Sequence, residues 1–258
     1  EEQRLLQDTF ARLFASESTS DRIRDAESTG FDEALWKTLQ ENGIALMRIP
    51  ESAGGLGSSL FDAMLITEQA GRCLASVPLV ECLVTSRLLA QLADVPVAQE
   101  WLESVIASGT FVSFAFNAPH AENLQTIPAA TQADAVILLE GDQLWIADCR
   151  KQQQQCSKSL GSGAIGQSDL SEERSLLATG QTALATYSAA LAEWKLLTAS
   201  MLFGLAQRGL ELAAELLHEK VAQVRPLPID DALPHPDASL VRDQPGRLRA
   251  AHHRDCLL

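Results

Sequence analysis

The chain has 258 residues, of which 46% are hydrophobic, and carries a formal net charge of −14 at pH 7. That length is enough for one large domain or two smaller ones with a buried core. The acidic balance argues against a nucleic-acid partner, because phosphate binding requires a basic surface.

Cysteine usage favours a reducing, cytoplasmic location. The five cysteines are odd in number, widely spaced and form no C-x-x-C pair. This pattern predicts neither a disulfide framework nor a zinc site, and His218, His252 and His253 have no thiolate or carboxylate partners at ligand spacing, so no metal is expected. No secretion leader opens the sequence, and no apolar run reads as long enough to span a bilayer, so we also expect no membrane partner.

Apolar residues recur at helical spacing through about the first hundred residues. Short connections between the periodic segments favour a compact helical domain over residues 1–108. The pattern predicts helices over residues 4–15, 31–39, 60–74, 79–92 and 97–106.

The most specific local pattern is RIPESAGGLGSSL over residues 48–60, here named the glycine turn. Pro50 fixes φ, and either Ser58 or Ser59 can cap the helix that follows. Taken alone, the segment predicts an interhelical turn. Three of its residues allow a positive φ or a close backbone approach: Gly54, Gly55 and Gly57.

The composition changes after residue 110. Runs rich in β-forming residues at 111–116, 135–139 and 143–147 predict a small β domain over residues 109–180. Gly141 lies between the last two runs and favours a hairpin turn there.

Residues 150–172 are polar and rich in Gly and Ser, which predicts a flexible loop. A literal G-x-G-x-x-G occurs at residues 161–166. A dinucleotide-binding site needs a strand before this motif and a helix after it, and the neighbouring sequence predicts neither. We therefore interpret the motif as part of the loop.

Residues 183–224 contain the longest helical pattern. Leucines recur on more than one face, which predicts a helix buried on several sides, as in a bundle core or an oligomer interface. Residues 225–258 hold five of the ten prolines and no periodicity, so we expect them to be irregular. Residues 181–258 thus read as an incomplete C-terminal helical domain, and the predicted fold class is α+β, mostly α.

Three motifs in the first hundred residues resemble the acyl-CoA dehydrogenase family, and the likeness resumes at residues 196–216. The motifs are Trp36-x-x-Leu39-x-Glu41-x-Gly43-Ile44, then Ile49-Pro50-Glu51-x-x-Gly54-Gly55-Leu56-Gly57, then Ile66-x-Glu68-x-x-Gly71-Arg72, continued by Pro78 and Glu81.

This resemblance implies a helical domain, a β domain and a four-helix C-terminal domain, with FAD as the cofactor and an acyl-CoA thioester as the substrate. In such enzymes a glutamate removes the α-proton while the flavin accepts the β-hydride. The resemblance also implies an oligomer, either homomeric or with a paralogous subunit.

Two site residues follow from the resemblance. Some members carry the base at a position that falls at about Trp194, which makes Glu193 the candidate catalytic base, with a solvated helix residue as the alternative. Gln223 matches one position of the family's Arg-x-Gln-Phe motif and is the candidate cofactor contact, although Val221 stands at the arginine position. The family's Thr-Glu-Pro flavin loop has no clear counterpart at residues 117–125.

The expected function is FAD-dependent α,β-dehydrogenation of an acyl-CoA thioester. Two alternatives stay open at this point. One is a non-catalytic subunit that completes the active site of a flavin-bearing paralogue. The other is an inactive product whose C-terminal domain is truncated or frameshifted near residue 225.

Overall fold

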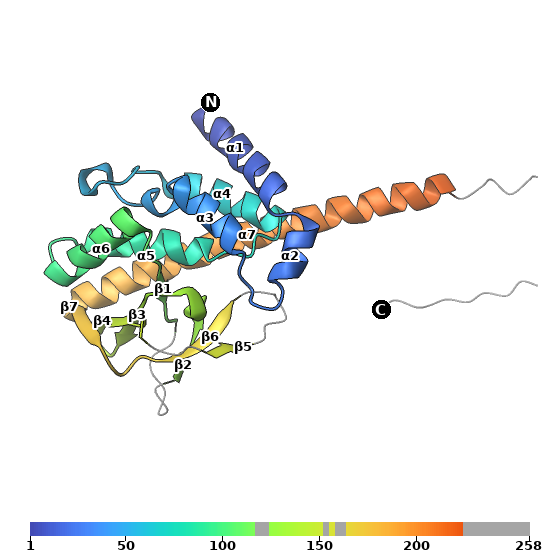
Figure 1. The fold of residues 1–258 in the computed structure, drawn as a ribbon. Coiled ribbons are helices and arrows are strands. Elements are labelled where there is room, and N and C mark those ends of the chain that lie inside the picture. Colours follow the sequence, from blue (N-terminus) through green and yellow to red (C-terminus); the bar gives the residue numbers. More distant parts are fainter. Residues whose placement is uncertain (117–123, 152–154, 158–163, 224–258) are drawn as a thin grey trace, which may run out of the picture. The chain divides into compact units, whose positions relative to one another are not determined.

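The computed structural model describes residues 1–116, 124–151, 155–157 and 164–223 (Figure 1). Contacts divide the chain into two units, Glu1–Glu215 and Leu216–Leu258. The described residues of the first unit form helices in the N-terminal part, then two small sheets, then the greater part of a long helix. The predicted class, α+β and mostly α, is confirmed.

The predicted N-terminal helices are confirmed to within a few residues, and one more is found. Helix α2 has seven residues, too few for a periodic pattern, and begins after Thr19, whose side chain accepts a hydrogen bond from the Arg22 amide. Asp32 caps α3 in the same way at the Leu35 amide. The bounds are α1 Glu2–Glu17, α2 Ser20–Ala26, α3 Glu33–Glu41, α4 Leu60–Arg72, α5 Leu79–Gln91 and α6 Pro96–Ser108.

The β domain contains two sheets. The four-stranded sheet has the order β1-β3-β4-β7, in which β1 and β3 are parallel and the other pairs antiparallel. The predicted hairpin joins β3 to β4, with Gly141 at a φ of 62°. The strands of this sheet are β1 Val112–Phe114, β3 Ala135–Glu140, β4 Gln143–Asp148 and β7 Arg174–Thr179.

The second sheet corrects the prediction of a flexible loop. Its order is β2-β6-β5, all antiparallel, with β2 at Leu124–Pro128, β5 at Gln155–Ser157 and β6 at Ile165–Asp169. Strands β5 and β6 fall in the polar segment, where side chains give no alternating pattern and pairing is set by the neighbouring strand. Gly166 lies inside β6, so the last glycine of the G-x-G-x-x-G motif does not lead into a helix, while Gly161 and Gly163 lie outside the described residues.

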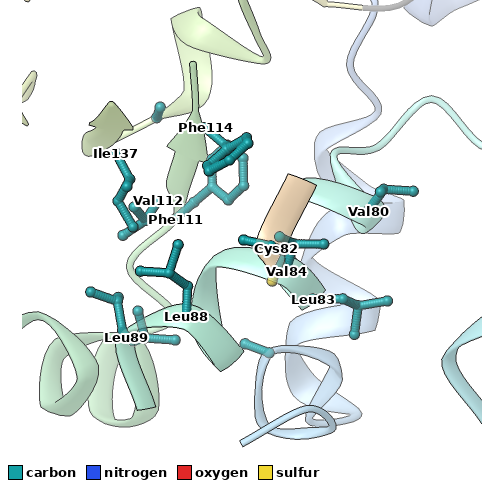
Figure 2. Packing of buried hydrophobic residues seen from close by; sticks show 14 of the residues in the cluster. Val80, Cys82, Leu83, Val84, Leu88, Leu89, Phe111, Val112, Phe114 and Ile137 are labelled. Carbon is teal, nitrogen blue, oxygen red and sulfur yellow. The ribbon is translucent and has the colours of Figure 1, made fainter. Parts of the chain in front are cut away.

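Helix α5 connects the helical domain to the first sheet. Figure 2 shows its buried side chains in one cluster with those of β1 and β3. The hydroxyl of Thr85 on α5 donates to the carbonyl of Val112 at 2.8 Å, so a polar side chain also joins the two elements. Nine of the thirteen residues of α5 are buried, which agrees with the apolar character of most of the helix.

Helix α7 (Gly180–Gln223) confirms the predicted long helix. It crosses α4 so closely that the backbones of the two helices are in contact. A Cβ on Gly71 would overlap the carbonyl oxygen of Met201, and a Cβ on Gly204 would overlap that of Glu68. The Ser200 hydroxyl donates to the carbonyl of Met64 at 2.7 Å next to this crossing. Glycine on both helices is therefore what lets them approach so closely.

Within the described part of the chain, α7 is buried on one side only, so no bundle core surrounds it there, whereas its burial in an oligomer interface stays a prediction. One face packs against α4, α5 and β1, and large apolar residues on the rest of its surface are 40–73% exposed: Leu196, Leu202, Phe203, Leu205, Leu210 and Leu212.

Helix α7 also corrects the expectation that no run could span a bilayer. Its Gly180–Glu219 stretch is long and apolar enough to do so by length and composition. Core helices of soluble proteins pass the same test, and α7 carries the buried charged residue Glu193 on its packed face.

We expect Gly204→Ala to destabilise the protein and Gly209→Ala on the same helix to leave it unchanged or slightly more stable. The first substitution forces the α4 and α7 backbones apart, at a cost of about 1–3 kcal/mol. A Cβ on Gly209 meets no atom within 4 Å, and alanine is favoured over glycine in a helix by up to about 1 kcal/mol. Urea unfolding followed by circular dichroism measures both; equal effects would contradict the backbone contact.

Candidate functional site

The glycine turn is folded back on itself by backbone hydrogen bonds. The amide of Gly57 donates to the carbonyl of Ile49 at 2.9 Å, and that of Ser58 donates to Met47 at 2.8 Å. A Cβ on Gly55 would overlap the Ile49 carbonyl, which confirms the close approach predicted for one of these glycines. Ser59 then caps α4, in a reciprocal capping box with Asp62.

This fold brings Arg48 to a buried position against α7. Its side chain is 3% exposed, its Nε–H donates to Glu193 Oε1 at 2.9 Å, and an Nη1–H donates to the carbonyl of Ser58. The half-exposed Arg87 of α5 approaches the other carboxylate oxygen of Glu193 at 3.3 Å. One carboxylate on α7 is thus held by guanidinium groups from the glycine turn and from α5.

A second carboxylate lies beside this cluster in a different environment. Glu81, partly buried in the first turn of α5, accepts a hydrogen bond from the indole N–H of Trp194 at 2.9 Å. Burial raises the pKa of Glu81 above its ordinary value, and the hydrogen bond from Trp194 partly offsets the rise. Two carboxylates thus meet at adjacent positions of α7. Glu193 is paired with two arginines, whereas Glu81 accepts a hydrogen bond from the neutral indole of Trp194.

Aromatic side chains seal the end of β1 against α7. The Tyr187 hydroxyl donates to the carbonyl of Ala115 at 2.8 Å, and its ring stacks on Phe114 with centroids 4.9 Å apart. About two turns further along α7, the rings of Phe116 and Trp194 lie 4.2 Å apart. These contacts place Phe116 against Trp194, whose indole also bonds to Glu81.

The predicted site residues have different outcomes. Glu193 is only 8% exposed and ion-paired, so the alternative of a solvated helix residue is wrong, whereas its role as a base stays a prediction. Gln223 is the last residue of α7, and its side chain lies outside the described part of the chain, as do residues 117–123 of the loop.

Sequence reasoning missed the roles of Arg48, Glu81 and Arg87. A signal was present for Glu81, because it is a lone carboxylate among apolar residues in the first turns of α5. Arg48 opens the glycine turn, but nothing in the sequence pairs it with a residue 145 positions away. Among the residues that the structure describes, no group of three potential metal ligands lies together.

The helical domain, two small sheets and long packed helix together define the acyl-CoA dehydrogenase fold. A family model for the N-terminal domain of acyl-CoA dehydrogenases matches residues 1–109. The chain is similar to the acyl-CoA dehydrogenase IpdE2 of Mycobacterium tuberculosis, with 39% identity over 82 residues, and to benzylmalonyl-CoA dehydrogenase of Aromatoleum aromaticum, with 28% over 151 residues. These stretches cover 31% and 57% of this chain, and 26% and 40% of the two relatives' own lengths.

Solved structures share the fold over more of the chain. The ChsE4-ChsE5 complex from Mycobacterium tuberculosis matches with a TM-score of 0.71 at 19% identity, covering 83% of this chain and 66% of the other. Butyryl-CoA dehydrogenase from Megasphaera elsdenii matches with a TM-score of 0.65 at 13% identity, covering 81% and 68%. Residues 1–109 therefore match the N-terminal domain of the acyl-CoA dehydrogenase family, and the described part of the chain has the fold of these solved structures.

The cavity beside α6 does not offer a site for the pyrophosphate of the FAD that the resemblance implies. The two β-domain arginines that line a cavity of about 430 Å³ beside α6 are already engaged. Arg150 bonds to Asp148 and lies over the ring of Trp101, while Arg174 bonds to Glu140. Each cation has a carboxylate partner, so this cavity offers no free positive charge for a pyrophosphate.

We expect Glu193→Gln and Arg48→Met each to lower the free energy of unfolding by about 3–5 kcal/mol, because each leaves a buried partner unpaired. The double variant should lose less than the sum, with a coupling of about 1–3 kcal/mol. Lys37→Met is the control, since its pair with Glu41 is exposed and should change stability by under about 0.5 kcal/mol. Additive losses in urea unfolding would contradict the buried pair.

The raised pKa of Glu81 makes stability depend on pH. The folded state binds the proton more tightly than the unfolded state, so this carboxyl's contribution is fully present below its ordinary pKa of 4.5 and is lost as pH rises through the folded value. Glu81→Gln keeps an acceptor for Trp194 and cannot ionise. We therefore expect its stability relative to wild type to increase between about pH 4 and pH 8.

Urea unfolding at several pH values tests this trend, with the exposed Glu41→Gln as the control. A difference between Glu81→Gln and wild type that does not change with pH would rule out a raised pKa at this position.

Proposed function

We propose that the protein is part of an FAD-dependent acyl-CoA dehydrogenase that oxidises the Cα–Cβ bond of an acyl-CoA thioester. The observation that carries this proposal is the sequence similarity to two proteins named as dehydrogenases of acyl-CoA and benzylmalonyl-CoA. As an oxidoreductase of lipid or related acyl metabolism, it would act in the cytoplasm. Because the matched stretches are shorter than half of either relative, activity and substrate are proposals for the protein as a whole.

The reaction needs a carboxylate base, a polarised thioester carbonyl and a hydride acceptor. FAD supplies the acceptor when bound, and Gln223 is the proposed contact to it. Glu193 is the base that the resemblance suggests, but one of its oxygens accepts from Arg48 and the other is ion-paired with Arg87, so abstracting a proton would require one of these contacts to open. Its geometry favours a role in holding α7.

We expect purified full-length protein to be yellow, with visible flavin absorption close to one FAD per chain, and the colour to bleach when acyl-CoA is added. Gln223→Ala should lower the bound flavin without changing the circular dichroism spectrum. Once turnover is measured, Glu193→Gln decides between the two roles: complete loss of turnover at retained flavin content supports the base. A colourless protein that stays colourless with added FAD would contradict flavin binding by this chain alone.

The alternative of a non-catalytic subunit has its own support. Two similar folds were solved as assemblies, in the ChsE4-ChsE5 complex and in the Tcur3481-Tcur3483 steroid ACAD variant. Under this alternative the purified chain is colourless, and turnover appears only on co-expression with a flavin-bearing paralogue. A colourless chain that is inactive in both settings supports an inactive product.

A further inference from the structure

The carboxylate of Glu81 is not neutralised by a cation among the described residues. It lies in the first turn of α5, and its side-chain partner is the neutral indole of Trp194, whose N–H donates to Oε1 at 2.9 Å. Glu193, the next residue to Trp194 on α7, has Arg48 on one oxygen and Arg87 on the other. The two carboxylates therefore differ in whether a lone pair is free to take up a proton.

The second oxygen of Glu81 is open to a reacting group. No other described residue donates a hydrogen bond to Oε2. In the described part of the chain, the one side-chain polar atom that is both buried and without a partner is Nε1 of Trp145. Because Oε2 of Glu81 is not such an atom, it is not sealed inside the core.

The surroundings of Glu81 strengthen it as a base. The ring of Phe116 lies 4.2 Å from the ring of Trp194, so the indole that contacts Glu81 is itself packed against an aromatic side chain. Burial raises the pKa of Glu81, and the hydrogen bond from Trp194 partly offsets the rise. A general base works best when its pKa lies near the operating pH, so a raised carboxyl pKa suits the removal of a proton.

Resting on the proposed function, we propose that Glu81 is the base that removes the α-proton of the acyl-CoA thioester and that Trp194 positions it. The α C–H bond breaks, its proton passes to Oε2 of Glu81, and the electron pair moves into the enolate of the thioester. This step requires no hydride acceptor. When it reverses in D2O, a deuteron replaces the proton at Cα.

Glu193 has a different part in this arrangement. Its ion pairs with Arg48 and Arg87 tie α7 to the glycine turn and to α5. Because Trp194 is its neighbour on the helix, these ion pairs also hold the indole in place against Glu81. Glu193 thus acts on the reaction only through the position of Trp194.

Few groups around Glu81 titrate together with it. Burial raises the pKa of the Cys82 thiol to about 12 and also raises the pKa of the Tyr187 hydroxyl, so both stay neutral near pH 7. The charged groups on α5, on α7 and in the glycine turn are paired with one another: Arg87, Glu193 and Arg48. We therefore expect a single rise of the proton-transfer rate with pH, as Glu81 ionises.

Deuterium incorporation at Cα in D2O, measured by mass spectrometry, tests the proposal with the full chain and three probes: butyryl-CoA, octanoyl-CoA and 3-phenylpropionyl-CoA. We expect the chain to label at least one of them, and Glu81→Gln to label it about a hundredfold more slowly or worse. The exposed Glu41→Gln is the matched control and should label at the wild-type rate. Circular dichroism checks the fold of Glu81→Gln, whose amide oxygen still accepts from Trp194.

Trp194→Phe separates a base from a residue that only supports the fold. The substitution keeps a ring beside Phe116 but removes the donor that lowers the pKa of Glu81. The pH profile of labelling should therefore move to higher pH. Slower labelling with an unmoved profile would overturn the proposal.

Two further results would also overturn it. Labelling that survives Glu81→Gln, or that is lost only in Glu193→Gln, would take the base away from Glu81 and leave the proposed function standing. A wild-type chain that labels none of the three thioesters also contradicts the proposal. Bleaching of bound flavin by acyl-CoA in that same protein would then show that the proposed function holds without this base, and its absence would show that both fail.

Discussion

The close backbone contact between α4 and α7 is the constraint on which the arrangement of the site depends. Because Gly71 and Gly204 leave no room for a side chain, the position of α7 along α4 is fixed at that point. This position also sets which residues of the earlier part of α7 face the helical domain. Glu193 lies within hydrogen-bond distance of Arg48, and Trp194 lies within hydrogen-bond distance of Glu81. Hydrogen bonds then fix the rotation of the helix, which apolar packing alone specifies less strictly.

The glycine turn contributes to this arrangement in a way that its sequence does not reveal. The sequence of the turn predicts only a backbone conformation, and its glycines do allow the backbone to fold back on Ile49. Its first residue, however, reaches from the turn to α7 and pairs with a buried carboxylate. The turn is therefore both a marker of the family and one side of the junction between the helical domain and α7.

The sequence predicted the elements better than their contacts. Strong helical periodicity located α4 to α7, and β-rich runs located β1, β3 and β4. Strands β5 and β6 were not predicted because their polar sequences have no apolar alternation, and α2 was not predicted because seven residues hold too few turns. The pairing of Glu193 with Arg48 could not be predicted, since it depends on how α7 crosses α4 and not on any local spacing.

The long sequence separation across the α4–α7 contact has a consequence for synthesis. Met64 and Ser200 are 136 residues apart, so the face of α4 that receives α7 is made well before its partner. At about 5–20 residues per second, the nascent helical domain spends roughly 7 to 27 seconds without that cover. During this interval the apolar surface of α4 around Gly71 is open to chaperones, so the speed of translation affects how reliably the protein reaches its native state.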